Sequence, residues 1–431
     1  MNLIQKKIPN ARWLRIIPIV IVANLIQWID KSVISFALPG GMMKDLGMSS
    51  ATAGLLGTAF SIGYLFLQVP GGNLAAKGKS KKLLGSTMLG WTIILFLLGT
   101  ATTSTQALTY RFLLGFCEGA IMPALVTIIA NWFPNEERGR ANAALLASAS
   151  ISQIVAGPMS SIILASHNWR FLFTFSAMLS VILLVIWMIF LVERPVDAKW
   201  LSEEERNYIL TSLDEGKINK KTNEKAPLLE VLKDKNIWKI CCIYLFSSLG
   251  TLGLSFWLPT IIKTITKTGM TQTGFLSVIP NLAIFIGVLS IGVISDKTQK
   301  RRLLAGMCPL MFSGLLLVAM LLQNNPWLSM GVLCIACLFL QGTGANIWAM
   351  LPRLLSPEKA GSARGIINMS SNIGGLIAPL GIGYIKDVTG SMQLSWYIIF
   401  GLCIVGFLIS LTLPSYLNEP VKKAEKTVVN A

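Results

Sequence analysis

The chain is poor in histidine, and its cysteines show no pattern that would build a site. Among 431 residues it has one histidine, His167, and seven cysteines. A metal centre or proton relay made of several imidazoles is therefore excluded. The cysteines are odd in number and lie in apolar stretches, which argues against a disulfide framework. Cys334 and Cys337 have CxxC spacing without a second pair nearby, so we predict no metal site and no cofactor.

Charged residues are also scarce, at 13% of the chain against 53% apolar residues. A soluble protein of this length needs a larger polar surface. Apolar stretches recur, and each is long enough to cross about 30 Å of hydrocarbon as a helix. They lie at 14–37, 52–76, 82–101, 107–131, 141–165, 170–192, 237–262, 273–295, 303–322, 327–351, 365–385 and 392–415. We therefore predict an all-α integral membrane protein with twelve transmembrane helices in the lipid bilayer.

The net charge of +17 is distributed unevenly between the loops. If both termini share one side, the loops on that side hold 30 of the 37 lysine and arginine residues. This is the positive-inside bias, and it places both termini in the cytoplasm. It also explains the positive charge without a nucleic-acid partner, which we do not expect. The first apolar run is too long for a signal peptide, so we interpret it as a retained transmembrane helix.

The spans divide into two sets of six. We predict an N-terminal six-helix bundle at 1–193, a cytoplasmic central loop at 194–236 and a C-terminal six-helix bundle with a cytoplasmic tail at 237–431. Two loops repeat one pattern, from Gly72 to Lys82 and from Gly292 to Arg302. Each loop begins with a glycine and has a basic pair nine and ten residues later. The position four residues after the glycine is Ala76 in the first loop and Asp296 in the second. This internal similarity indicates duplication, which is typical of transporters with a site between two bundles.

These loops resemble the cytoplasmic-loop motif of the major facilitator superfamily, and the resemblance covers essentially the whole chain. In that family the acidic residue of the motif meets a helix end and helps to latch one conformation. The resemblance implies a conformational latch formed by Gly72, Gly292, Asp296 and Arg301. The first loop has Ala76 where the family usually has aspartate, so only the second loop keeps the acidic residue.

Narrower motifs are similar to the anion:cation symporter branch of that superfamily. They are Gln27-Trp28-Ile29-Asp30-Lys31, the segments 60–72 and 111–119, Trp132-Phe133-Pro134, Trp257-Leu258-Pro259 and the segment 201–208. In the last, Ser202 and Glu205 also have the spacing of a helix capping box. The branch usually has arginine where this chain has Lys31. The resemblance implies two six-helix bundles that import small organic anions together with protons by alternating access.

Four ionisable residues lie inside predicted spans, and they are Asp30, Lys31, Arg111 and Glu118. A charge near the middle of a membrane costs roughly 2.5–3.5 kcal/mol on insertion scales, so such residues point to function. Arg111 and Glu118 are seven residues apart and share one helix face. On the first span, Lys31 falls in a polar stripe with Asn24, whereas Asp30 points toward a neighbouring helix.

Our hypothesis divides the work between cations and carboxylates. Lys31 and Arg111 bind the substrate anion, and Asp30 and Glu118 carry the coupled protons. A carboxylate in a poorly hydrated cavity can exchange a proton near neutral pH, and the arrival of an anion at a neighbouring cation would change its affinity for that proton. The alternative is a structural role, in which these residues form ion pairs that hold helices together. Asp30 would pair with Arg111, or Glu118 with Lys31.

Uncharged polar residues in the spans are further candidates for binding substrate. They are Gln27, Tyr64, Gln153, Asn368 and Asn372. Such groups suit the hydroxyls of a sugar acid, because a buried polar site rejects ligands that lack the matching group. Their alternative role is interhelical hydrogen bonding, worth about 0.6 kcal/mol each.

The expected function is import of a small organic anion, such as a hexuronate, an aldonate or another carboxylate, by proton symport. We expect a monomer in the plasma (inner) membrane of a bacterium. Catalytic motifs such as HExxH and GxxxxGK[ST] are absent, so we do not expect an enzyme. The alternatives are an exchanger of anions or drugs and, further away, a transporter-derived sensor.

Overall fold

The computed structural model describes residues 10–218, 228–355 and 357–418, which form helices and connecting turns with no strand among them. Residues 219–227 of the predicted central loop and the predicted tail from 419 lie outside the described residues. From the N-terminus the elements are α1 (Ala11–Ala37), η1 (Leu38–Met42), α2 (Met43–Asp45), α3 (Ser50–Leu74), η2 (Ala75–Lys79), α4 (Ser80–Gly99), α5 (Ser104–Glu118), α6 (Ile121–Trp132), α7 (Asn135–Ser166), α8 (Trp169–Phe190), η3 (Pro195–Asp197) and α9 (Glu203–Ile218). They continue with α10 (Leu228–Leu232), α11 (Lys235–Thr266), α12 (Met270–Leu276), α13 (Val278–Thr298), α14 (Arg301–Leu321), α15 (Pro326–Phe339), α16 (Gly342–Leu354), α17 (Pro357–Thr389), α18 (Gln393–Leu411) and η4 (Ser415–Asn418).

Eleven helical stretches of the described chain are long and apolar enough to cross a membrane. One of them, Ser50–Gly99, has 50 residues. As a straight helix it would measure about 75 Å, more than twice the thickness of the hydrocarbon core. Its helical geometry is interrupted at Gly78, whose φ is 72°. This stretch therefore holds the two predicted spans 52–76 and 82–101, and the predicted all-helical membrane fold is confirmed.

Two predicted spans are broken helices, whereas the sequence predicts one continuous helix for each. The span 107–131 consists of α5 and α6, separated at Gly119 and Ala120. The cause is Pro123, which has no N–H to donate to the carbonyl of Gly119 four residues earlier. The span 327–351 is likewise divided between α15 and α16, next to Gly342, and glycine weakens a helix.

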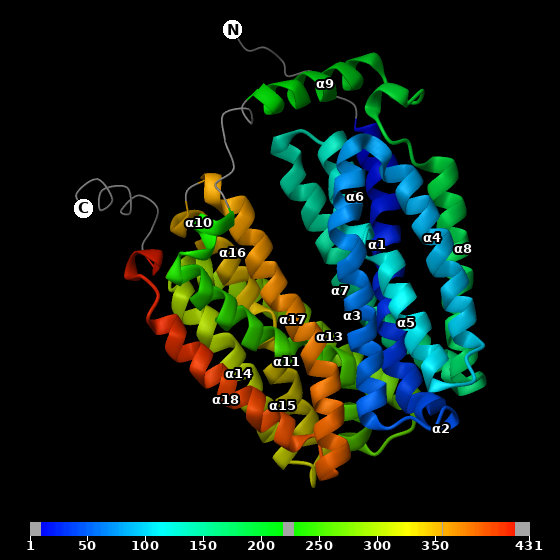
Figure 1. Cartoon of the computed structure of the whole chain (residues 1–431), viewed down its shortest axis with the longest axis vertical. Coiled ribbons are helices and arrows are strands. Elements are labelled where there is room, and N and C mark those ends of the chain that lie inside the picture. The colour runs from blue at the N-terminus through cyan, green and yellow to red at the C-terminus, as the bar shows by residue number, and fades with distance from the viewer. Residues whose placement is uncertain (1–9, 219–227, 356, 419–431) are drawn as a thin grey trace. The chain divides into compact units, whose positions relative to one another are not determined.

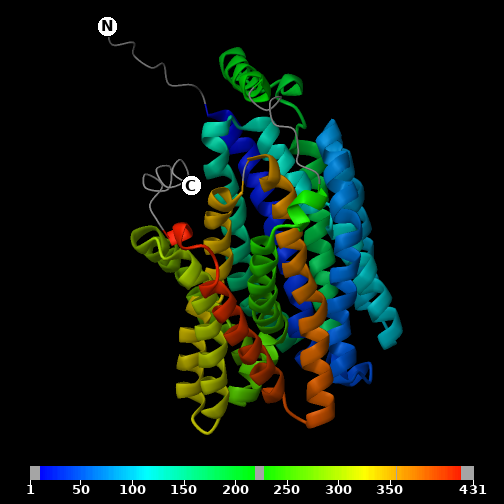
Figure 2. The same cartoon turned by 60° about the vertical axis from the view of Figure 1, so that its left-hand side comes forward.

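The chain folds into two compact units. Unit 1 comprises Met1–Val33, Ala59–Ala156 and His167–Thr222, and unit 2 comprises Ile34–Thr58, Gly157–Ser166 and Asn223–Ala431. In unit 1, α4 packs along α5 and along α8 (Figure 1). In unit 2, α11 packs along α17, and α14 along α15 and α18 (Figure 2). The division into two six-helix halves stays a prediction, because parts of α1, α3 and α7 belong to each unit.

Unit 2 holds the start of α3 against α17. The carboxylate of Asp387 accepts hydrogen bonds from the backbone N–H groups of Ser50 and Ala51 at 2.8 and 2.7 Å. The free N–H groups at a helix start favour a carboxylate at this position. Close by in sequence, a Cβ at Gly383 would overlap the carbonyl oxygen of Ser50. The backbones of α3 and α17 are therefore in direct contact at this point.

Glycines bring α3 and α5 into backbone contact inside unit 1. A Cβ at Gly115 would overlap the carbonyl oxygen of Phe60, and a Cβ at Gly119 would overlap that of Tyr64. A Cβ at Gly63 would meet the backbone of α5 equally closely. Small residues at an interface allow two membrane helices to approach closely enough for strong van der Waals packing. The side chains of Phe60 and Tyr64 are thereby fixed beside α5.

The helix α9 lies across the end of unit 1, next to the start of α1 (Figure 1). Arg12 of α1 donates from Nη1 to Glu205 of α9 and from Nη2 to Glu137 of α7, both at 2.6 Å. Arg12 and Glu205 are 1% and 0% exposed. A buried, charge-assisted pair of this kind is strict about geometry, so it fixes where α9 docks.

The predicted capping box at the start of α9 forms only in part. Ser202 accepts a hydrogen bond from the backbone N–H of Glu205 at 3.2 Å, as the motif predicts. The carboxylate of Glu205 does not serve the cap, because it accepts from Arg12 and from the backbone N–H groups of Ala11 and Arg12. Hydrogen bonds between charged groups outweigh a neutral cap, and here they decide the orientation of the carboxylate.

We expect Arg12→Ala to loosen α9. The substitution leaves the buried carboxylate of Glu205 without its cation, at a cost of about 3 kcal/mol. Limited proteolysis of the membrane-embedded protein should therefore cut within 194–218 many times faster than in the wild type. Arg15→Ala is the matched control, since Arg15 is exposed and only stacks on Trp200, at 5.0 Å. Equal cleavage rates in Arg12→Ala and wild type would contradict the docking role.

We expect Gly115→Ala to lower the thermal unfolding temperature of the purified protein. The added methyl group forces α3 and α5 apart, at a cost of about 1–3 kcal/mol. The control is Gly401→Ala in α18, where no described atom outside the local backbone of α18 lies within 4 Å of the position that the new methyl group would take. That substitution should leave the temperature unchanged or raise it, because alanine favours a helix. A Gly115→Ala protein as stable as wild type would show that the two helices can separate freely.

Candidate functional site

Two cations predicted to bind substrate meet at one aromatic ring in unit 1. Cζ of Arg111 lies 4.6 Å from the ring centre of Phe60, and Nζ of Lys31 lies 5.5 Å from the same centre. The Lys31 ammonium is also 4.7 Å from the ring of Trp28 and 5.6 Å from that of Tyr64. A cation over an aromatic face gains about 0.5–2 kcal/mol, more when water is excluded. The two residues predicted to bind the substrate anion therefore lie against the same ring, and their role in binding stays a prediction.

The two carboxylates predicted to carry protons are fully buried in the same unit. Glu118, the last residue of α5, accepts a hydrogen bond from Nε2 of Gln27 at 3.0 Å. Asp30 accepts from the hydroxyl of Ser180 in α8 at 3.0 Å. This contact agrees with the expectation that Asp30 faces a neighbouring helix. In each carboxylate the other oxygen, Oε1 of Glu118 and Oδ1 of Asp30, is buried without a hydrogen-bond partner.

The ion pairs of the structural alternative do not form. Within the described parts of the chain, neither Asp30 with Arg111 nor Glu118 with Lys31 makes an ion pair. Glu118 is still near enough to both cations to interact with them electrostatically. Arg111 is 2% exposed, and its Nε and Nη1 donors have no acceptor. Buried donors normally have acceptors, so this guanidinium has capacity for a ligand that the protein does not supply.

The remaining polar residues of the first predicted span have separate partners. Asn24 donates to the carbonyl oxygen of Leu145 and to the hydroxyl of Ser148 in α7, at 3.0 and 2.8 Å. Gln153 of α7 accepts from the hydroxyl of Ser32 at 3.1 Å. These bonds join α1 to α7 and fit the role of interhelical hydrogen bonding. We call Asp30, Lys31, Arg111 and Glu118, with the groups in contact with them, the charged cluster. Of the predicted polar candidates in unit 1, Gln27 and Tyr64 belong to it.

The two asparagines predicted in the C-terminal half belong to α17 of unit 2. Asn368 is exposed and Asn372 is half-buried. Neither side chain makes a hydrogen bond within the described residues. Their side chains are therefore available, and their role in binding substrate stays a prediction.

The second copy of the loop motif forms an ion pair within its own loop. Nη2 of Arg301 lies 3.2 Å from Oδ1 of Asp296, whose side chain is 77% exposed. A methyl group added at Gly292 would meet no atom within 4 Å, and one added at Gly72 would contact only Pro123, at 3.4 Å. The matched glycines are therefore not required by tight packing here, and the role of these four residues as a latch stays a prediction.

Three residues of the cluster were absent from the predicted site, namely Trp28, Phe60 and Ser180. Trp28 was detectable in principle, because it precedes Lys31 by three residues and so shares its helix face. Phe60 stands one helical turn before Tyr64, which was predicted. Ser180 lies in the sixth predicted span with no local signal, and only the packing of α8 on α1 reveals it.

Comparison with known proteins identifies the family of the chain. The family model described as Major Facilitator Superfamily matches residues 20–379. A putative tartrate transporter of Agrobacterium vitis is 29% identical over 93% of both chains. A quinolone resistance transporter of Acinetobacter baumannii is 28% identical over 94% of both. A probable galactarate/D-glucarate transporter of Escherichia coli K12, GarP, is 28% identical over 88% of this chain and 89% of its own.

Solved structures show the same fold at lower sequence identity. A bacterial homologue of the human lysosomal transporter Spinster matches 98% of both chains with a TM-score of 0.70 and 14% identity. The nucleoside transporter NupG matches 93% of this chain and all of its own with a TM-score of 0.69 and 15% identity. The relatives and the fold are those of transporters and not of enzymes. The chain therefore belongs to the major facilitator superfamily, as its loop motifs predicted, and is a multi-pass membrane transport protein.

Proposed function

We propose that this transporter imports a small organic anion, such as a sugar acid or another carboxylate, together with protons. The relatives named for tartrate and for galactarate or D-glucarate support this substrate class. The proposal includes alternating access by a monomer in the plasma (inner) membrane of a bacterium. It also includes cytoplasmic termini, on the basis of the lysine and arginine bias of the loops.

The observation that carries the proposal is the buried guanidinium of Arg111 with two unused donors. An arginine in a low-dielectric site binds a carboxylate by short, charge-assisted hydrogen bonds. Lys31 adds a second positive charge at the same Phe60 ring. A carboxylate ligand would supply the hydrogen-bond acceptors that Nε and Nη1 of Arg111 lack.

Glu118 and Asp30 are the groups proposed to carry protons. Each keeps one buried oxygen without a donor, and a proton can be accepted there. Glu118 is the better placed of the two, because it interacts electrostatically with both Arg111 and Lys31. An anion that binds at Arg111 brings a negative charge close to Glu118, and two like charges in one site favour protonation of the carboxylate. Substrate and proton then bind together, which is the requirement for symport.

An exchanger is the second candidate, and one relative favours it. The quinolone resistance transporter of Acinetobacter baumannii is as similar to this chain as the organic-anion relatives. The rings of Trp28, Phe60 and Tyr64 around Lys31 also offer faces on which an aromatic ligand could stack. An exchanger would need a counter-substrate inside the membrane vesicle, whereas a symporter needs only a proton gradient.

The test is uptake of labelled tartrate, galactarate and other sugar acids into proteoliposomes under an inward proton gradient. We expect a protonophore to abolish accumulation by the wild-type protein. Glu118→Gln keeps the shape and the bond from Gln27 but cannot release a proton, so it should lose gradient-driven uptake and retain exchange of labelled for unlabelled substrate. Asp45→Asn, which alters an exposed carboxylate, is the control. Uptake that ignores the gradient but follows internal substrate would favour the exchanger.

We expect Arg111→Lys and Lys31→Arg to differ in their effects on KM. Arg111→Lys removes the planar guanidinium, which can bind a carboxylate through two hydrogen bonds. We therefore expect KM to rise about tenfold or more. Replacing Lys31 keeps the charge and the contacts with aromatic faces, so KM should change less than about threefold. Transport assays with surface expression measured in parallel give both values. The opposite order of effects would make Lys31 the main anion-binding cation.

A further inference from the structure

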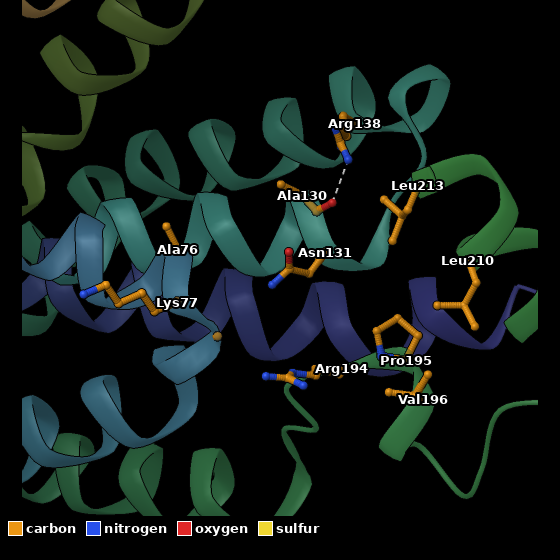
Figure 3. A pocket seen from close by; sticks show the side chains of 11 residues that line it. Ala76, Lys77, Ala130, Asn131, Arg138, Arg194, Pro195, Val196, Leu210 and Leu213 are labelled. Atoms are coloured by element: carbon orange, nitrogen blue, oxygen red, sulfur yellow. Dashed lines mark hydrogen bonds between the residues drawn. The ribbon is translucent and has the colours of Figure 1, made fainter. Parts of the chain in front are cut away.

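A pocket at one end of unit 1 has a positively charged lining that the transport site does not use. Its volume is about 520 Å³, and it lies between the turn that joins α3 to α4, the ends of α6 and α7, the segment after α8, and α9. Figure 3 shows its side chains around one space. The charged residues among those described are Lys77, Arg138 and Arg194, and none of the described lining residues is a carboxylate.

Two of these cations have free donors. Arg138 is engaged, because its Nε and Nη2 donate to the carbonyl oxygens of Phe133 and Ala130 at 2.9 and 2.7 Å. The side chains of Lys77 and Arg194 are exposed and make no hydrogen bond or ion pair within the described parts of the chain. Arg138 therefore supplies fixed charge, while Lys77 and Arg194 can donate to a ligand.

The backbone is shaped to bring Arg194 to the turn between α3 and α4. Gly78 has a φ of 72°, a conformation that favours glycine, and a methyl group built on it would lie 2.9 Å from Nη2 of Arg194. The preceding carboxylate, Glu193, is not among the described residues that line the pocket, and it accepts a hydrogen bond from the backbone N–H of Ser80 at the start of α4. Lys77 and Arg194 thus share a concave surface on which no described lining residue carries a negative charge.

The other side of the pocket is apolar. Val196 is 51% exposed, and Leu210 and Leu213 of α9 complete this side. The pocket lies where α3, α6 and α8 end, which is the depth of lipid headgroups for helices that cross a bilayer. A ligand that combines an anion with an apolar group matches both sides.

We propose that this pocket binds a phosphate group that carries an apolar substituent. A membrane supplies this chemistry as an acidic phospholipid, and the solution supplies it as a phosphorylated metabolite. The lipid is favoured by the depth of the pocket and by Lys81 and Lys82 near it in the sequence, because clustered lysines attract anionic headgroups. The site is separate from the charged cluster at Arg111, so its existence does not depend on the transported substrate.

The test measures binding of fluorescent phosphatidylglycerol to the purified full-length protein in detergent. The double variant Lys77→Gln/Arg194→Gln should bind roughly 30-fold more weakly, since each lost cation near the headgroup weakens binding several-fold. Lys79→Gln is the matched control for single Lys77→Gln, because Lys79 is equally exposed but does not line the pocket. We expect Lys79→Gln to bind within about threefold of wild type. Thermal unfolding of each variant shows that the fold is intact.

Further arms of the same assay identify the source of the phosphate. Displacement by unlabelled phosphatidylglycerol but not by millimolar glycerol 3-phosphate supports the lipid. Displacement by glycerol 3-phosphate at concentrations similar to the lipid keeps the phosphate site and assigns it to a soluble ligand. The proposal is overturned if phosphatidylcholine binds as tightly as phosphatidylglycerol, if the double variant binds like wild type, or if Lys79→Gln weakens binding as much as Lys77→Gln. These outcomes are independent of uptake, so failure here leaves the proposed transport function standing.

Discussion

Four ionisable side chains lie inside unit 1, and their direct contacts are with neutral groups and not with one another. A charge removed from water needs compensation, and an opposite charge is the usual source of it. Here Lys31 and Arg111 lie over aromatic rings. Glu118 accepts a hydrogen bond from the amide of Gln27, and Asp30 accepts one from the hydroxyl of Ser180. Direct ion pairing would use up the donors of Arg111. Because it is absent, α1, α3, α5 and α8 must all be placed so that the weaker partners reach their charges.

The glycine contact between α3 and α5 satisfies much of this requirement. It fixes the rings of Phe60 and Tyr64 beside the face of α5 that bears Arg111 and Glu118. At the other end of unit 1, Arg12 fixes α9 in place, and the docked α9 forms one wall of the phosphate pocket. Both arrangements depend on close packing of groups far apart in the sequence, and both would be lost if one helix shifted by a few ångströms.

The helices could be predicted from the sequence because the length of an apolar run is a local property. The family could be predicted from short motifs, and the four ionisable residues from their position within apolar spans. The break after Glu118 was missed because an otherwise apolar run conceals the missing N–H of Pro123. The partners of the charges were harder still. Phe60 and Ser180 serve Arg111 and Asp30 across helix interfaces, and no spacing within one helix encodes that.

The backbone contact between α3 and α5 also limits how unit 1 can deform. The carbonyl oxygens of Phe60 and Tyr64 lie so close to Gly115 and Gly119 that no Cβ would fit between them. We therefore expect the two helices to move as one rigid body. This α3–α5 pair carries Phe60, Tyr64, Arg111 and Glu118, whereas α1 carries Gln27 and Lys31. A change in the distance between Lys31 and Arg111 would then require α1 to slide against the α3–α5 pair. The hydrogen bond from Gln27 to Glu118 crosses this interface, so it would break and form again as α1 slides.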